Sequence, residues 1–196
     1  MAIDLNNHKH LFNVENDTEL QELQNQLTDD NKPYVIYDKS TGDCVFRPEA
    51  QYTINLNNAW QLSTTLSNPN TSLYDGVYES YSNKGVDDSY AEMMITIVGY
   101  SNFKLYIRSY AESSYDYVMV SKLDKPIDNH SLNSNPNDIK ATTQDNQTSG
   151  NSINNYTLVE FSDIDYGEHV IYIIYRKDSS VNENDDCGYV LIPKNQ

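Results

Sequence analysis

Apolar and polar residues alternate in short runs over most of the chain beyond residue 60, and polar, turn-rich segments separate the runs. A period of two residues predicts strands with one face buried. The predicted strands are Glu92–Val98, Phe103–Tyr110, Tyr115–Val120, Tyr156–Phe161, Glu168–Tyr175 and Tyr189–Ile192, with weaker signals at Leu73–Tyr78 and Ile139–Thr143. Glu168–Tyr175 is rich enough in isoleucine to predict a central strand. Many strands without intervening helical patterns predict a mainly β fold, an antiparallel β-sandwich of jelly-roll type.

A different pattern occupies the N-terminal part, where the spacing of leucines predicts one amphipathic helix. Leu20, Leu23 and Leu27 recur at helical intervals, and Thr18 is the expected N-cap. The apolar stripe is narrow, so two interpretations stay open. The helix either covers a sheet of its own chain or provides a seam for self-association.

Residues 34–46 form two β-rich runs around a turn that contains Gly42, which predicts a hairpin. A two-stranded hairpin is only marginally stable alone, so helix and hairpin together are expected to dock on a partner. The predicted organisation is a docking segment at 1–59 and a β-sandwich domain at 60–196, with a short strand within Gln51–Leu56. The expected partner-binding residues are Leu20, Leu23, Leu27, Tyr34 and Ile36.

Charge excludes some classes of partner. The chain has 29 acidic and 13 basic residues and a net charge of −16, whereas nucleic acids and anionic membranes are bound through Lys and Arg. We therefore expect no nucleic-acid and no membrane partner. The N-terminus lacks the apolar core of a signal peptide, so synthesis in a cytoplasm is expected.

No sequence motif of a hydrolase, nucleotide-binding protein or metalloenzyme is present, so the chain is expected to be no enzyme and to need no cofactor or metal. Two alternatives rest on carboxylates. The segment Asp178–Asp186 contains oxygen ligands suited to calcium but lacks EF-hand spacing. The pair Asp163 and Asp165 would be the acidic site of an unrecognised enzyme. Cys44 and Cys187 match no zinc or disulfide pattern.

Tyrosine is unusually frequent, with 17 copies in 196 residues. A tyrosine side chain combines an apolar ring with a polar tip, which suits both half-buried sheet faces and recognition surfaces. Sheet packing accounts for most of these residues. The alternative is a glycan-binding face, and Tyr78, Tyr81 and Tyr115 are its candidates.

Three stretches carry a family resemblance: residues 78–85, residues 100–124, and the pair of segments 174–180 and 188–193. Together they resemble a β-sandwich module of gut Bacteroidales proteins and of virion proteins from their crAss-like tailed bacteriophages. The resemblance covers about residues 75–193 and leaves out the first 59.

The resemblance implies a head-fibre or decoration subunit of a virion, fixed to the capsid by its N-terminal segment and displaying the sandwich outward. Its implied partners are further copies of itself, as a homo-oligomer, and other head-fibre or capsid proteins. The alternative function is a carbohydrate-binding module for adhesion to host surface glycans.

Overall fold

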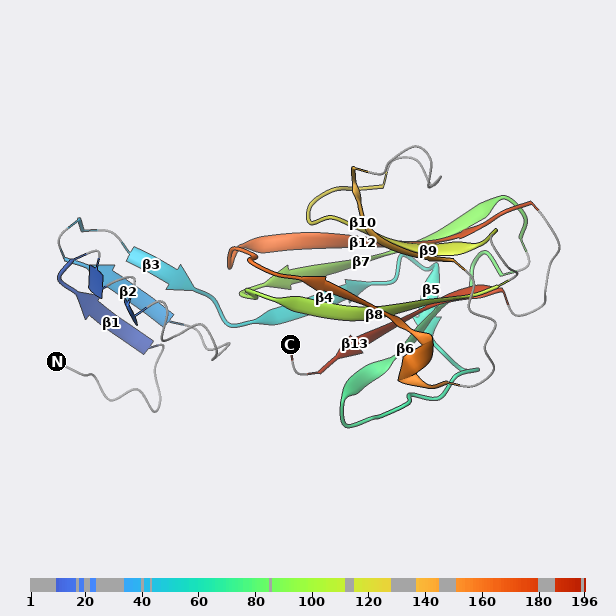
Figure 1. Ribbon diagram of the computed structural model, residues 1–196, viewed down its shortest axis with the longest axis horizontal. Helices are drawn as coiled ribbons and strands as arrows, with labels where there is room; N and C mark the ends of the chain where they lie inside the picture. Colours follow the sequence, from blue (N-terminus) through green and yellow to red (C-terminus); the bar gives the residue numbers. More distant parts are fainter. Residues whose placement is uncertain are drawn as a thin grey trace. The chain divides into compact units, whose positions relative to one another are not determined.

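The computed structural model describes residues 10–16, 18–19, 22–23, 34–39, 41–42, 44–84, 86–111, 115–127, 137–144, 151–179, 186–194 and 196. Its sandwich consists of two five-stranded sheets (Figure 1). The first sheet has the order β10-β9-β12-β7-β4, with bounds β4 Gln51–Asn55, β7 Ser89–Val98, β9 Tyr117–Ser121, β10 Ile139–Gln144 and β12 Glu168–Lys177. The second has the order β11-β8-β13-β6-β5, with bounds β5 Trp60–Leu62, β6 Tyr74–Ser80, β8 Phe103–Tyr110, β11 Thr157–Phe161 and β13 Cys187–Pro193.

The predicted β-sandwich is therefore confirmed. All eight strands expected beyond residue 60 are present, including the two weaker ones, and β12 is the central strand of its sheet, as its isoleucine content indicated. The strand expected within Gln51–Leu56 is β4. Trp60–Leu62 was not predicted, because a strand of three residues is too short to show an alternating pattern.

The core lies between the two sheets and follows from the alternation of side chains. Along β7, Ala91, Met93 and Ile95 are buried while the residues between them are half-buried. Where the sheets meet at Gly188 in β13, an added Cβ would lie 2.8 Å from Val118 Cγ2 and 2.9 Å from Tyr175 Cβ. Glycine at this position therefore lets the two sheets approach closely.

Loops also cover part of each outer face, so several strands are buried on both sides. On the sheet that contains β9 and β12, Met119 and Ile174 pack with Ile127 from the loop after β9. On the other sheet, a second cluster joins Tyr74, Val77, Tyr156, Cys187, Tyr189 and Leu191. The three-residue 3-10 helix Ile153–Asn155 (η1) contributes Ile153 to the rim of that cluster.

A third, three-stranded sheet precedes the sandwich in the chain. It contains β1 His10–Val14, β2 Tyr34–Asp38 and β3 Cys44–Arg47. The predicted hairpin is confirmed as the antiparallel pair β2 and β3. Strand β1 was not predicted, and it pairs with β2 in parallel, with Phe12 opposite Ile36.

The predicted helix falls mostly outside the described residues, among them Leu20 and Leu27. Residues 18–19 and 22–23 are helical. The N-cap differs from the prediction, because Asn16 Oδ1, and not Thr18, accepts the backbone N–H of Glu19 at 3.0 Å. In return, Glu19 Oε2 accepts the N–H of Glu15 at 3.0 Å, a reciprocal arrangement close to a capping box.

By packing, the chain divides into two compact units. The first comprises Met1–Tyr52, Ile97–Ser101 and Ser162–Glu168, and the second comprises Thr53–Thr96, Asn102–Phe161 and His169–Gln196. The sequence-based boundary at residues 59 and 60 stays a prediction. In the part of the chain that the structure describes, no helix combines the length and apolarity needed to cross a bilayer.

Candidate functional site

Three charged side chains of the sandwich, Asp116, Lys177 and Asp186, form a buried cluster. Lys177, the last residue of β12, is completely buried, and its Nζ donates to Asp186 Oδ2 at 3.1 Å. The same ammonium lies 3.5 Å from Asp116 Oδ2, and Asp116 is also fully buried. The hydroxyl of Tyr175 donates to Asp116 Oδ2 at 3.3 Å, and the backbone N–H of Asp178 donates to its Oδ1 at 2.7 Å.

The pKa shifts of this cluster follow from its burial and its charges. Desolvation raises the pKa of Asp116, and the backbone hydrogen bond from Asp178 and the charge of Lys177 only partly offset it. Desolvation alone would lower the pKa of Lys177, but the bond to Asp186 and the charge of Asp116 outweigh it, so the pKa is raised. Desolvation and the nearby Asp116 also raise the pKa of Tyr175 far above its usual range.

This cluster has the character of a structural element. Asp116 and Lys177 have no side-chain exposure, and Asp186 has only 1%. The carboxylates satisfy an ammonium, a hydroxyl and a backbone N–H, which fastens the ends of β12 and β13 together with the turn before β9. A substrate would have no access to these groups in this conformation, so they provide no reaction centre.

A second network of polar side chains surrounds Glu79 on β6. Its carboxylate accepts hydrogen bonds from Ser63 Oγ at 2.6 Å, from Gln61 Nε2 at 2.8 Å and from Thr65 Oγ1 at 2.8 Å. Burial raises the pKa of Glu79, but these three donors outweigh burial, so the pKa lies below its usual range. The network fixes the segment after β5 against the outer face of its sheet.

The two acidic segments considered in the sequence analysis have structural roles where the structure describes them, at Asp165 and at Asp186. Asp165 Oδ1 accepts the backbone N–H of Gly167 at 2.9 Å in a turn. Residues 180–185, most of the possible calcium segment, lie outside the described residues, and Asp186 at its end binds Lys177. Within the described ranges, no group of three or more His, Cys, Asp or Glu is arranged to hold a metal ion.

The three candidate tyrosines of a glycan face lie at separate positions. Tyr78 is half-buried within β6, whereas Tyr81 is 42% exposed and its hydroxyl donates to the backbone oxygen of Asn58 at 2.8 Å. Tyr115 is 55% exposed in the turn before β9. Among the described contacts, none joins the three rings to one another. A glycan face formed by these tyrosines stays a prediction.

The expected partner-binding residues are only partly described. Ile36 is completely buried within the chain, so its side chain presents no surface in this state. Leu23 is half-buried, and Tyr34 pairs with His10 and with Arg47 in the three-stranded sheet. Tyr37, one residue beyond Ile36, is 38% exposed.

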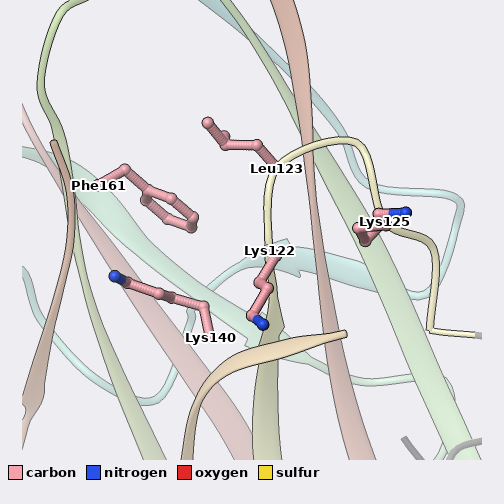
Figure 2. A pocket seen from close by; sticks show the side chains of 5 residues that line it. All are labelled: Lys122, Leu123, Lys125, Lys140 and Phe161. Atoms are coloured by element: carbon pink, nitrogen blue, oxygen red, sulfur yellow. The ribbon is translucent and has the colours of Figure 1, made fainter. Parts of the chain in front are cut away.

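An open pocket lies where the edge strands β10 and β11 of the two sheets meet. Its volume is about 350 Å³, and Lys122, Leu123, Lys125, Lys140 and Phe161 line it (Figure 2). Phe161 ends β11, Lys140 belongs to β10, and the other three follow β9. Figure 2 shows Lys140 alongside the Phe161 ring, with the ammonium of Lys125 directed away from the rest. The Lys140 Nζ lies 5.8 Å from the Phe161 ring centroid.

Backbone hydrogen bonds hold in place the turn that carries Lys122 and Lys125. The N–H of Lys122 donates to the oxygen of Asp138 at 2.8 Å, which ties the end of β9 to the start of β10. Asp124 has a φ of 58°, and its N–H donates to Val170 O at 2.8 Å. Its carboxylate accepts the Val170 N–H at 2.8 Å and lies 2.6 Å from His169 Nδ1. The pocket wall is thus a fixed turn.

Sequence reasoning missed this pocket. The lysines occupy positions 122, 125 and 140, and the alternating pattern gave no sign that β10 and β11 would meet. The charge distribution gave little sign of it, because residues 122–140 contain three lysines and also three aspartates. Only the pairing of the strands brings Phe161 beside them.

Comparisons with known proteins add the following. No family model and no curated protein sequence matches the chain. Among solved structures, the chain is similar to the secreted serine protease VesC from Vibrio cholerae, at 8% identity and a TM-score of 0.40. That match covers 64% of this chain and 26% of VesC. It is also similar to TmCBM61, solved with β-1,4-galactotriose, at 8% identity and a TM-score of 0.36, over 74% of this chain and 88% of that one.

Proposed function

We propose that this chain is a non-enzymatic structural protein of a bacteriophage particle, a head-fibre or decoration subunit that displays its β-sandwich outward. The observation that carries the proposal is the division into two packed units, a small one with a three-stranded sheet and a larger sandwich. Such a division suits a protein that is attached through one part and displays the other. The sequence resemblance of residues 75–193 to virion proteins supports the same role.

Assembly, not catalysis, is the proposed mechanism. The charged side chains that the structure brings together, Asp116, Lys177 and Asp186, are buried and serve packing. In the N-terminal unit, β1 and β3 are the outer strands of their sheet in the described part of the chain. Edge strands offer unpaired backbone groups to another chain, so they are the natural surface for a second copy or a capsid protein.

A truncation tests this proposal. A chain lacking residues 1–47 keeps β4 and residues 48–50. The backbone of residues 48–50 packs closely against Gly99, since a Cβ added to Gly99 would lie within 3.0 Å of it. We expect the truncated chain to fold, with an unchanged β-type circular dichroism spectrum, and to be missing from purified particles that incorporate the full chain. Incorporation of the folded truncated chain at the full level would contradict attachment through the N-terminal unit.

Recognition of host surface glycans is the second candidate function. The observation in its favour is the exposure of two of the candidate tyrosines, Tyr81 at 42% and Tyr115 at 55%, since an apolar ring with a polar tip suits a recognition surface. The experiment is a titration of the purified full chain with a panel of surface polysaccharides. Saturable binding supports this function, and flat titrations across the panel contradict it.

A further inference from the structure

The buried cluster of Lys177, Asp116 and Asp186 lies where the two sheets of the sandwich meet. Lys177 is the last residue of β12 in the first sheet, and Asp186 immediately precedes β13 in the second. Asp116 immediately precedes β9, the neighbour of β12. The three side chains are at most 1% exposed, so no substrate from outside reaches them. This exclusion does not prevent a reaction between side chains of the cluster itself.

An amine and a carboxyl group in contact are the two reactants of an amide bond. Lys177 Nζ lies 3.1 Å from Asp186 Oδ2, and the carboxyl carbon is one covalent bond further away. Folding holds both groups in this position, and well-oriented intramolecular reactants reach effective concentrations of about 10⁵ M or more. Because bulk water does not reach the buried cluster, the reverse reaction, hydrolysis of the amide, is disfavoured.

Proton positions in the cluster also suit condensation, since two carboxyl groups surround one ammonium. Burial raises the pKa of Asp116, which favours the protonated form of this carboxyl group. Desolvation lowers the pKa of Lys177, but the hydrogen bond to Asp186 outweighs it, so the ion pair is the resting state. Transfer of one proton from Lys177 to Asp186 leaves an uncharged amine and an uncharged carboxyl group. Burial reduces the cost of this step, because it disfavours charged groups.

We propose that Lys177 and Asp186 condense to an intramolecular amide bond, which joins the two sheets covalently. The neutral Nζ attacks Asp186 Cγ, a C–N bond forms, and one C–O bond of the carboxyl group breaks. Asp116 Oδ2, 3.5 Å from Nζ, gives its proton to the departing hydroxyl, which leaves as water. Asp116 then takes one proton from the Lys177 nitrogen and returns to its starting state. The Tyr175 hydroxyl, which donates to Asp116 Oδ2 at 3.3 Å, positions this carboxyl group.

This bond would fasten the ends of β12 and β13 to each other in every folded copy of the chain. It concerns the sandwich alone, so it rests neither on attachment to a particle nor on glycan recognition.

Mass spectrometry of the purified full chain under denaturing conditions tests the bond. We expect an intact mass that is lower than the mass of the sequence by one water molecule. Lys177→Arg should have the full mass of its own sequence, because a guanidinium stays protonated and does not attack a carboxyl group. A parent chain of full mass would overturn the proposal, and so would a loss of water that persists in Lys177→Arg.

A tryptic digest identifies the two residues that are joined. Trypsin does not cleave after a lysine whose amine is acylated, so residues 177–194 should appear as one peptide that lacks one water. Residues 109–122 joined to residues 177–194 would place the bond at Asp116 and overturn the assignment of Asp186. The pair Lys104 and Glu160 is an internal control, since its N–O distance is 3.0 Å but both side chains are 47% exposed. Cleavage after Lys104 should be complete, and an equal bond there would overturn the role of burial.

Asp116→Asn tests the proton transfer. The amide keeps the shape of the side chain but lacks its acidic proton, so the bond should form about a hundredfold more slowly or slower still. The readout is the fraction of newly synthesised chain that lacks one water at successive times, with circular dichroism to show that the variant is folded. Glu160→Gln, an exposed change of the same kind, should leave the rate within twofold. Bond formation at the parent rate in folded Asp116→Asn would overturn the role of Asp116.

Discussion

Single residues in this protein hold segments in place through buried charge. Glu79 accepts three side-chain hydrogen bonds, and Asp116 and Asp186 flank Lys177. A buried ion pair costs desolvation free energy when it forms, but removal of one partner is more costly because the other charge stays buried alone. These residues are therefore sensitive points for stability.

Replacement of Lys177 by methionine is predicted to lower the free energy of unfolding by about 3–5 kcal/mol. The substitution leaves Asp116 and Asp186 buried without their ammonium partner. Urea denaturation measures the change. Lys104→Met is the matched control, because the Lys104–Glu160 pair is 47% exposed on both side chains and its loss should cost less than about 1 kcal/mol. Equal effects of the two substitutions would contradict the structural role of the buried cluster.

Glu79 is predicted to contribute to acid sensitivity. Its pKa is lowered in the folded state, so the stability gained from the ionised carboxylate is complete above the unfolded pKa of about 4.3. That stability is lost as the pH falls through the lower folded pKa. The free energy of unfolding of Glu79→Gln, measured from pH 7 to pH 2, should therefore decline less steeply in this window. An acid limb as steep as that of the parent would show that Glu79 is not responsible.

At the scale of elements, the alternating pattern predicted the sandwich strands because each has one face toward the common core. The pattern was less informative where loops cover the outer faces, since Met119 and Ile174 are buried on the side away from the core. It also missed β1, whose pairing partner lies 24 positions later in the chain and leaves no local signal. The helix cap was misassigned because Asn16 and Thr18 are both good N-caps, and only the backbone selects one.

Close approach of the sheets predicts the effect of a methyl group at Gly188. An alanine Cβ there would lie 2.8 Å from Val118 Cγ2 and 3.1 Å from Trp60 Cη2, in a core that cannot expand without cost. Gly188→Ala should lower the free energy of unfolding by about 1–3 kcal/mol.

Gly76→Ala is the matched control for this element. Its Cβ meets only Leu62 Cδ2, at 2.7 Å, and Leu62 is a flexible side chain that is 57% exposed. Urea denaturation of both variants should show the larger loss at Gly188. A larger loss at Gly76 would mean that the sheets are spaced differently from this structure.

At the scale of the whole molecule, the candidate sites were harder to predict than the fold. A fold of this kind follows from local alternation. The pocket, in contrast, forms only because β10 and β11, the edge strands of two different sheets, meet. The composition shows that the chain is acidic, but it does not place the three lysines near Phe161. Likewise, Ile36 was expected at a partner surface because of its position in an apolar strand, and the structure buries it.

At this scale the central claim is the proposal that this chain is a structural component of a phage particle. Quantitative mass spectrometry of purified particles, from cells in which the chain is produced during infection, tests this claim most directly. The account predicts peptides from the whole chain in a fixed ratio to the major capsid protein, retained after density-gradient purification. Intact particles that lack the chain, with all of it left in the soluble lysate, would contradict the account.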